Sequence, residues 1–231
     1  MENILFLAFT EADGNLPKSA LEVLGAALEL GGSLQVGLIG AQIQPAANAI
    51  ANCGATKFLG VAGPDFAASR YASDAAAAEA ICRAAGAPIV LVPASSRSSR
   101  VMAGVAHRLG RKVDTHVTGI TVDGGKLNAS RWYYRQRMEA VLDRAQRPWV
   151  MLLEGGCHAP YAGTPGNAAV EAVAPAVTDS LKRTQVTGIR APQSDQQTIR
   201  PDAKLLFVAG AGWTKKQADG QIHGADAERP S

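Results

Sequence analysis

The sequence contains few aromatic residues and no apolar run long enough to cross a membrane. Phe, Trp and Tyr make up 5% of its 231 residues. No uninterrupted apolar stretch approaches the roughly 18 residues that a membrane-spanning helix needs. The N-terminal segment MENILFLAF also lacks the basic flank and the small-residue cleavage site of a signal peptide. We therefore expect no membrane insertion and a cytoplasmic location.

Cysteine is scarce as well. The three cysteines are Cys53, Cys82 and Cys157. Their odd number and wide spacing argue against a disulfide framework and fit a reducing compartment. Cys157 is followed by His158, but neighbouring side chains seldom point at each other, so we expect no thiol chemistry from this pair. The histidines lack the spacing of zinc ligands, so no metal site is expected.

The charged residues are spread along the chain and do not cluster in one region. The net charge is +3, and Lys and Arg are scattered rather than clustered, which does not favour nucleic-acid binding. One segment, residues 131–137 (RWYYRQR), interleaves arginines with aromatic residues. As a strand it would place Arg131, Tyr133, Arg135 and Arg137 on one face and Trp132, Tyr134 and Met138 on the other, with one face packed and one in water. A subunit interface and a plain solvated face both remain open for this segment.

Apolar runs of strand length alternate with segments of helical spacing in the first half of the chain. The strands expected are residues 3–9, 34–39, 57–61 and 88–92, and the helices are residues 17–30, 45–52, 72–85 and 100–109. Such alternation predicts right-handed crossovers and a parallel sheet with helices on both faces. The fold class is therefore α/β, Rossmann-like.

The second half of the chain has a different character. Three β-prone segments joined by short turns, residues 117–122, 127–134 and 138–143, predict an antiparallel extension of the sheet. A buried strand at 148–153 follows, then a loop rich in glycine and proline, then a strand around 184–189. We expect residues 1–190 to form one domain, residues 191–202 a linker, and residues 203–231 the start of a second domain with a disordered tail.

Two segments are candidate binding sites. The loop from Pro93 to Arg100 lies between a parallel strand and a helix, so Ser95, Ser96 and Arg97 are suited to holding a phosphate on free backbone amides. The same serines are also suited to a simple cap of the helix. Gly210 and Gly212 follow a predicted strand and match part of a dinucleotide-binding fingerprint, without its third glycine.

Several of these strings resemble the alpha subunit of electron transfer flavoproteins. The opening strand, acidic turn and Ala/Leu helix (ILFLAFTEADGNLPKSALEVLGAALELGG) are similar to the start of that family. Residues 54–57 (GATK) resemble its entry to the third strand, and residues 93–96 (PASS) its P-A-[ST]-[ST] loop. Residues 113–120 (VDTHVTGI) resemble its step into the antiparallel strands, with His116 as an intrusion. Residues 203–212 (AKLLFVAGAG) resemble the entry to its FAD domain.

The resemblance implies an electron carrier rather than an enzyme. It implies FAD as cofactor, a beta subunit as partner in a heterodimer, and dehydrogenases as electron donors. In place of the family's S-G-G-R-G turn, this chain has Ala209 to Trp213, with Gly212 at the arginine position. About twenty residues follow Gly210, too few for one βαβ unit. The FAD domain is thus expected to be truncated, and FAD is not expected to be retained by this chain alone.

Two other functions are alternatives for a chain of this pattern. A stand-alone nucleotide-binding module of the universal stress protein type would use the loop at 95–100, but the glycine-rich phosphate signature of those proteins is missing. An ATP pyrophosphatase of related fold would need an S-G-G-x-D-S loop after the first strand, which residues 10–14 (TEADG) do not provide.

Overall fold

The computed structural model describes residues 2–188, 205, 215–216, 218 and 220–221. Residues 1–187 form one compact unit, and the remaining residues group separately. The predicted linker at 191–202 lies outside the described residues, and so does nearly all of the strand predicted just before Gly210, at residues 204–209. The domain boundaries therefore stay a prediction, and the description below concerns the first unit.

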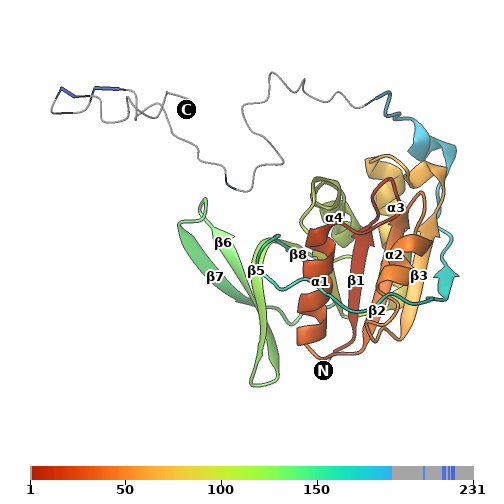
Figure 1. The fold of residues 1–231 in the computed structure, drawn as a ribbon, viewed down its shortest axis with the longest axis horizontal. Coiled ribbons are helices and arrows are strands. Elements are labelled where there is room, and N and C mark those ends of the chain that lie inside the picture. The colour runs from red at the N-terminus through yellow and green to blue at the C-terminus, as the bar shows by residue number, and fades with distance from the viewer. Residues whose placement is uncertain (1, 189–204, 206–214, 217, 219, 222–231) are drawn as a thin grey trace. The chain divides into compact units, whose positions relative to one another are not determined.

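A nine-stranded sheet forms the centre of this unit (Figure 1). Its strands are β1 (Ile4–Phe9), β2 (Leu34–Gly40), β3 (Lys57–Ala62), β4 (Ile89–Pro93), β5 (Val113–Asp123), β6 (Lys126–Tyr133), β7 (Met138–Asp143), β8 (Trp149–Leu153) and β9 (Val170–Ala172). They lie in the order β7-β6-β5-β8-β4-β1-β2-β3-β9. Only the β5–β6 and β6–β7 pairs are antiparallel. The predicted parallel sheet with an antiparallel extension is confirmed.

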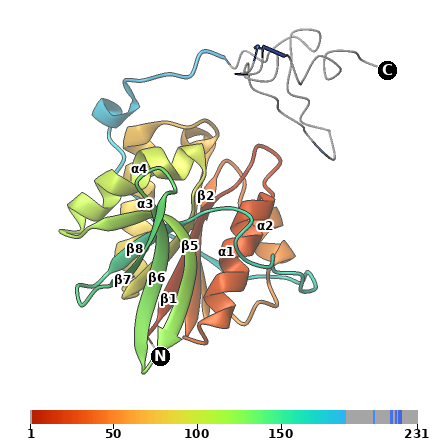
Figure 2. The ribbon, with the colours of Figure 1, turned by 90° about the vertical axis from the view of Figure 1, so that its left-hand side faces the viewer.

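The helices cover both faces of the sheet (Figure 2). They are α1 (Lys18–Glu29), α2 (Gln44–Ala49), α3 (Tyr71–Ala85) and α4 (Ser96–Arg108), with short 3₁₀ turns η1 (Pro64–Phe66) and η2 (Asp179–Lys182). One buried cluster joins α1 and α2 to Ile4 and Phe6 of β1. A second cluster joins α3 and α4 to Leu5 and Leu7 of the same strand. None of the helices in the described part of the chain is long and apolar enough to span a membrane.

Two boundaries differ from the sequence prediction. Helix α4 begins at Ser96, four residues before the predicted start at Arg100, because the side chain of Ser95 caps it. The predicted strand at 184–189 is wrong for its described part, since residues 184–188 form no strand. The strand that pairs with β3 is instead β9, which lies earlier in the chain. β9 therefore occupies the Phe58–Gly60 part of that edge of β3.

The segment that interleaves arginine and aromatic residues is only partly a strand. β6 ends at Tyr133, which pairs with Met138 of β7, and residues 134–137 form the turn between them. Arg135 and Arg137 therefore do not continue the face of Arg131. Met138 shares the face of Tyr133 rather than that of Trp132, because directly paired residues lie on the same side of a sheet.

A long irregular segment, residues 154–169, crosses the outer side of α1 and α2 and leads into β9 at the β3 edge (Figure 1). We call it the strap. The amide of Tyr161 donates to the carbonyl of Leu21 of α1 at 2.9 Å, and that of Gly166 donates to the carbonyl of Asn48 of α2 at 2.8 Å. Such contacts fix its path over two helices whose outer surfaces would otherwise face water.

The strap approaches α1 so closely that only glycine fits at position 25. A Cβ atom there would lie 2.2 Å from the carbonyl oxygen of Ala159. We predict that Gly25→Ala destabilises the protein by about 1–3 kcal/mol, because the backbone of the strap must shift. Urea unfolding followed by circular dichroism measures this change.

Gly104→Ala in α4 is the matched control. Its Cβ would meet the hydroxyl of Tyr71, the far end of a half-exposed side chain that is able to swing away. Helix propensity then makes this variant neutral or more stable by about 1 kcal/mol. Equal stability of the two variants would contradict the proposed close approach of the strap.

Candidate functional site

The loop from Pro93 to Arg100 lies at the point where the strand order reverses. From β1 the chain proceeds outward to β2 and β3, and it then returns to β4 on the other side of β1. In open α/β sheets, ligands bind at the carboxyl ends of the strands that flank such a switch point. Thr10 follows β1 and Ser95 follows β4, so the predicted loop occupies that position.

Ser95 is engaged as the cap of α4. Its hydroxyl oxygen accepts a hydrogen bond from the amide of Ser98 at 3.1 Å and lies 3.0 Å from the hydroxyl of Ser98, which is buried. Ser96 is exposed, and its side chain makes no hydrogen bond to any described residue. The structure thus realises the capping role for Ser95 and leaves Ser96 open to solvent.

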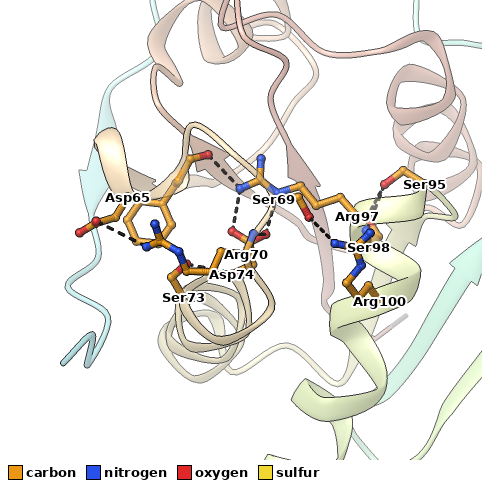
Figure 3. Close-up of polar contacts among 10 residues, drawn as sticks. Asp65, Ser69, Arg70, Ser73, Asp74, Ser95, Arg97, Ser98 and Arg100 are labelled. Carbon is orange, nitrogen blue, oxygen red and sulfur yellow. Dashed lines mark hydrogen bonds and ion pairs between the residues drawn. The ribbon is translucent and has the colours of Figure 1, made fainter. Parts of the chain in front are cut away.

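Arg97 points away from the loop and into an interhelical contact (Figure 3). Its Nε donates to Oδ2 of Asp74 at 2.8 Å, and its Nη2 donates to Oδ1 of the same carboxylate at 2.7 Å. Nη2 also donates to the carbonyl of Phe66 at 2.8 Å, and the guanidinium stacks 4.5 Å from the ring centre of Phe9. Because Asp74 is fully buried, this two-pronged pair holds α4 against α3 and η1.

Other polar side chains connect this contact to η1 and η2. Lys182 of η2 lies 2.7 Å from Asp65 of η1, and its hydrogen bond holds the pKa of Asp65 below the usual range. Arg70 lies 3.7 Å from the same carboxylate, and Arg100 donates to the hydroxyl of Ser69 at 3.3 Å. We call Asp65, Ser69, Arg70, Asp74, Arg97, Arg100 and Lys182 the polar cluster. Four cations and two anions give it a formal excess of positive charge.

The predicted cofactor residues therefore fall into two groups. Ser95 and Arg97 have structural partners, whereas Ser96, Ser99 and Arg100 are the exposed residues of the loop. Gly210 and Gly212 lie outside the described residues. Assignment of these positions to a cofactor stays a prediction.

A second polar centre, which the sequence did not reveal, lies at the base of the antiparallel extension. The buried carboxylate of Asp114 accepts hydrogen bonds from Nη2 of Arg144 at 2.7 Å and from Nε1 of Trp149 at 2.8 Å. Nη1 of Arg131 lies 3.5 Å away. These residues stand 17 to 35 positions from Asp114 along the chain, so only the sheet brings them together. Asp114 thereby joins β5, β6, β8 and the segment after β7.

The remaining reactive side chains do not form a site. In the part of the chain that the structure describes, no group of three His, Cys, Asp or Glu residues is placed to hold a metal ion. The thiol of Cys157 faces the carbonyl of Gly155 at 3.9 Å, and Nδ1 of His158 faces Glu29 at 3.6 Å. Burial, with smaller effects from Glu154 and Glu22, raises the pKa of Cys157, which disfavours the reactive thiolate.

The sheet order and the helices on both of its faces define a Rossmann-like α/β protein. The sequence pattern of the electron transfer flavoprotein domain matches residues 4–180, which is most of the chain. The chain belongs to the electron transfer flavoprotein domain family. Proteins of this family are electron carriers that bind flavin. No curated protein matches the chain.

We predict that Arg97→Gln destabilises the protein by roughly 3 kcal/mol, because it leaves the buried Asp74 carboxylate without its cation. The double variant Asp74→Asn, Arg97→Gln should recover part of this loss, since no buried charge remains. Arg100→Gln, in the same helix turn but exposed, should change stability by less than about 0.5 kcal/mol. Denaturant unfolding of the four proteins measures these differences, and an equal loss for Arg97→Gln and Arg100→Gln would refute the clamp.

Asp114 makes stability depend on pH. Burial acts to raise its pKa, but hydrogen bonds from Arg144 and Trp149 and the nearby arginine charges outweigh burial and lower it. The stabilisation is therefore complete above the ordinary aspartate pKa of about 3.9 and is lost as pH falls through the lowered value. We predict that Asp114→Asn is less stable at pH 7 and has a shallower decline in stability below about pH 5. Asp65→Asn, at a half-exposed ion pair, should change the profile less; equal profiles for wild type and Asp114→Asn would contradict this role.

Proposed function

We propose that this chain is the alpha subunit of an electron transfer flavoprotein and acts with a beta subunit and FAD. In that role it accepts no substrate of its own; electrons from dehydrogenases pass through the flavin toward the respiratory chain. The observation that carries the proposal is the family match over residues 4–180. The choice of the alpha subunit is supported by residues 203–212, whose sequence resembles the entry to the FAD domain of that subunit.

FAD supplies the redox chemistry when it is bound, and the protein contributes position and electrostatic environment. The described residues of the loop at 93–100 do not fit the diphosphate of such a cofactor, because Arg97 is held by Asp74 and Phe66. We therefore assign no step to FAD at this loop. The role that we propose for residues 2–188 is that of a rigid support for the carrier.

The antiparallel extension is the proposed contact surface for the beta subunit. β7 is the last strand of the described sheet on that side, and an unpaired edge exposes backbone groups that another chain is able to meet. Two of its apolar side chains, Met138 and Val141, are 57% and 69% exposed. Exposed apolar groups on an open edge favour a partner over a plain solvated face.

The proposed compartment is the cytoplasm. All three cysteines are free, two of them buried, which fits a reducing environment. The alternative of a stand-alone nucleotide-binding module gains no support from the loop geometry, since the cation expected to hold the phosphate is engaged with Asp74.

Co-expression with an electron transfer flavoprotein beta subunit tests the proposal. We predict that the tagged chain retains the beta subunit through affinity purification and size exclusion. Val141→Glu should weaken this association about tenfold or more, because it places a charge at the centre of an apolar contact. Val186→Glu is the matched control, because Val186 is also exposed but lies outside the extension. Failure of the wild-type chain to retain the beta subunit would overturn the proposal, and equal loss in both variants would overturn the surface.

A further inference from the structure

A pocket of about 510 Å³ lies at the end of the β6–β7 hairpin. We call it the hairpin pocket. Its lining residues are His116, Arg131, Trp132, Tyr133, Tyr134, Arg135 and Gln136. They come from the irregular part of β5, the end of β6 and the turn that follows it. Its volume lies in the range typical of small-molecule sites.

Backbone strain in the described residues is concentrated at this pocket. Four non-glycine residues there have a positive φ, namely His116 (58°), Tyr134 (45°), Arg135 (55°) and Gln136 (65°). All four line the hairpin pocket. Each such conformation costs of the order of 1 kcal/mol or more, and strained residues cluster where side chains are held for a ligand. Asn or Gly would relieve the strain of a simple hairpin turn, so the large side chains here require another reason.

The lining combines aromatic faces with cations. The rings of Tyr133 and Tyr134 meet edge to face with their centres 5.1 Å apart. The guanidinium of Arg131 lies 5.4 Å from the ring centre of Tyr133. Aromatic faces accept flat rings, and an arginine beside them adds a cation that stacks.

Carboxylates of the described residues balance only part of the positive charge in the pocket. Arg131 shares the carboxylate of Asp114 with Arg144, and its buried Nε has no hydrogen-bond partner. Arg135 forms no ion pair with any residue that the structure describes. His116 is already engaged, since its Nδ1 lies 2.8 Å from Oε1 of Glu154. The guanidinium of Arg135, which has no ion-pair partner among the described residues and lies beside aromatic rings, therefore favours an anionic group on the occupant.

From this combination we propose that the hairpin pocket binds a small, planar aromatic molecule that carries a carboxylate or phosphate group. The ring stacks against Tyr133 and Tyr134, and the anion lies between Arg131 and Arg135. This site is separate from the loop at the switch point and does not depend on the proposed carrier function.

Calorimetric titration of the full chain with 2-naphthoate and with the neutral 2-naphthamide tests the proposal. We expect 2-naphthoate to bind with a dissociation constant of about 1 mM or tighter and the amide to bind at least about tenfold more weakly. Quenching of Trp132 fluorescence should accompany binding and be absent in Trp132→Phe, which places the ligand in the pocket.

Two variants of the turn test the proposed contacts, and a third variant of the same turn is the control. Arg135→Gln and Tyr134→Ala should each weaken 2-naphthoate binding about tenfold. Arg137→Gln removes the same charge from the same turn, but Arg137 does not line the pocket, and this variant should bind as wild type does. The proposal is overturned by absence of saturable binding to wild type, by equal binding of acid and amide, or by equal loss in Arg135→Gln and Arg137→Gln. Melting curves of each variant establish that it is folded.

Discussion

All six side chains of β1 are buried, and they belong to two separate hydrophobic cores. Ile4, Phe6 and Ala8 pack toward α1 and α2, whereas Leu5, Leu7 and Phe9 pack toward α3 and α4. Alternating side chains of a strand point to opposite faces, so one short apolar segment holds both layers of helices to the sheet. β1 also pairs with β2 on one side and β4 on the other, which sets the strand-order reversal and thereby the position of the loop at 93–100.

Two carboxylate–arginine contacts fix the relative positions of elements that apolar packing alone does not fix. Asp74 and Arg97 join the N-terminal ends of α3 and α4, and Asp114 with Arg144 joins the antiparallel extension to the parallel sheet. Apolar packing is tolerant of small sliding movements, whereas a two-pronged pair with a buried carboxylate admits few geometries. The rigid placement of the loop and of the hairpin thus follows from a few directional bonds added to a broad apolar core.

The parts of the fold that the sequence revealed are those with strong local signals. Continuous apolar runs such as residues 3–9 and 88–92 predicted buried parallel strands, and the short turns after residue 122 predicted the antiparallel extension. β9 could not be found in this way, because its three residues (Val-Glu-Ala) carry no apolar run and become a strand only by pairing with β3. The polar centre at Asp114 and the ion pair of Arg97 also could not be predicted from the sequence, since the residues that they join are distant in the chain.

The contacts between the strap and helices α1 and α2 form late during synthesis of the chain. Glu22 of α1 accepts from the amide of Gly156, 134 positions later, and the side chain of Gln44 donates to the carbonyl of Ala168, 124 positions later. Contacts of such separation are slow to form, and during synthesis the N-terminal elements emerge from the ribosome long before their partners. The outer surfaces of α1 and α2 therefore stay uncovered in the nascent chain until the residues of the strap have been translated.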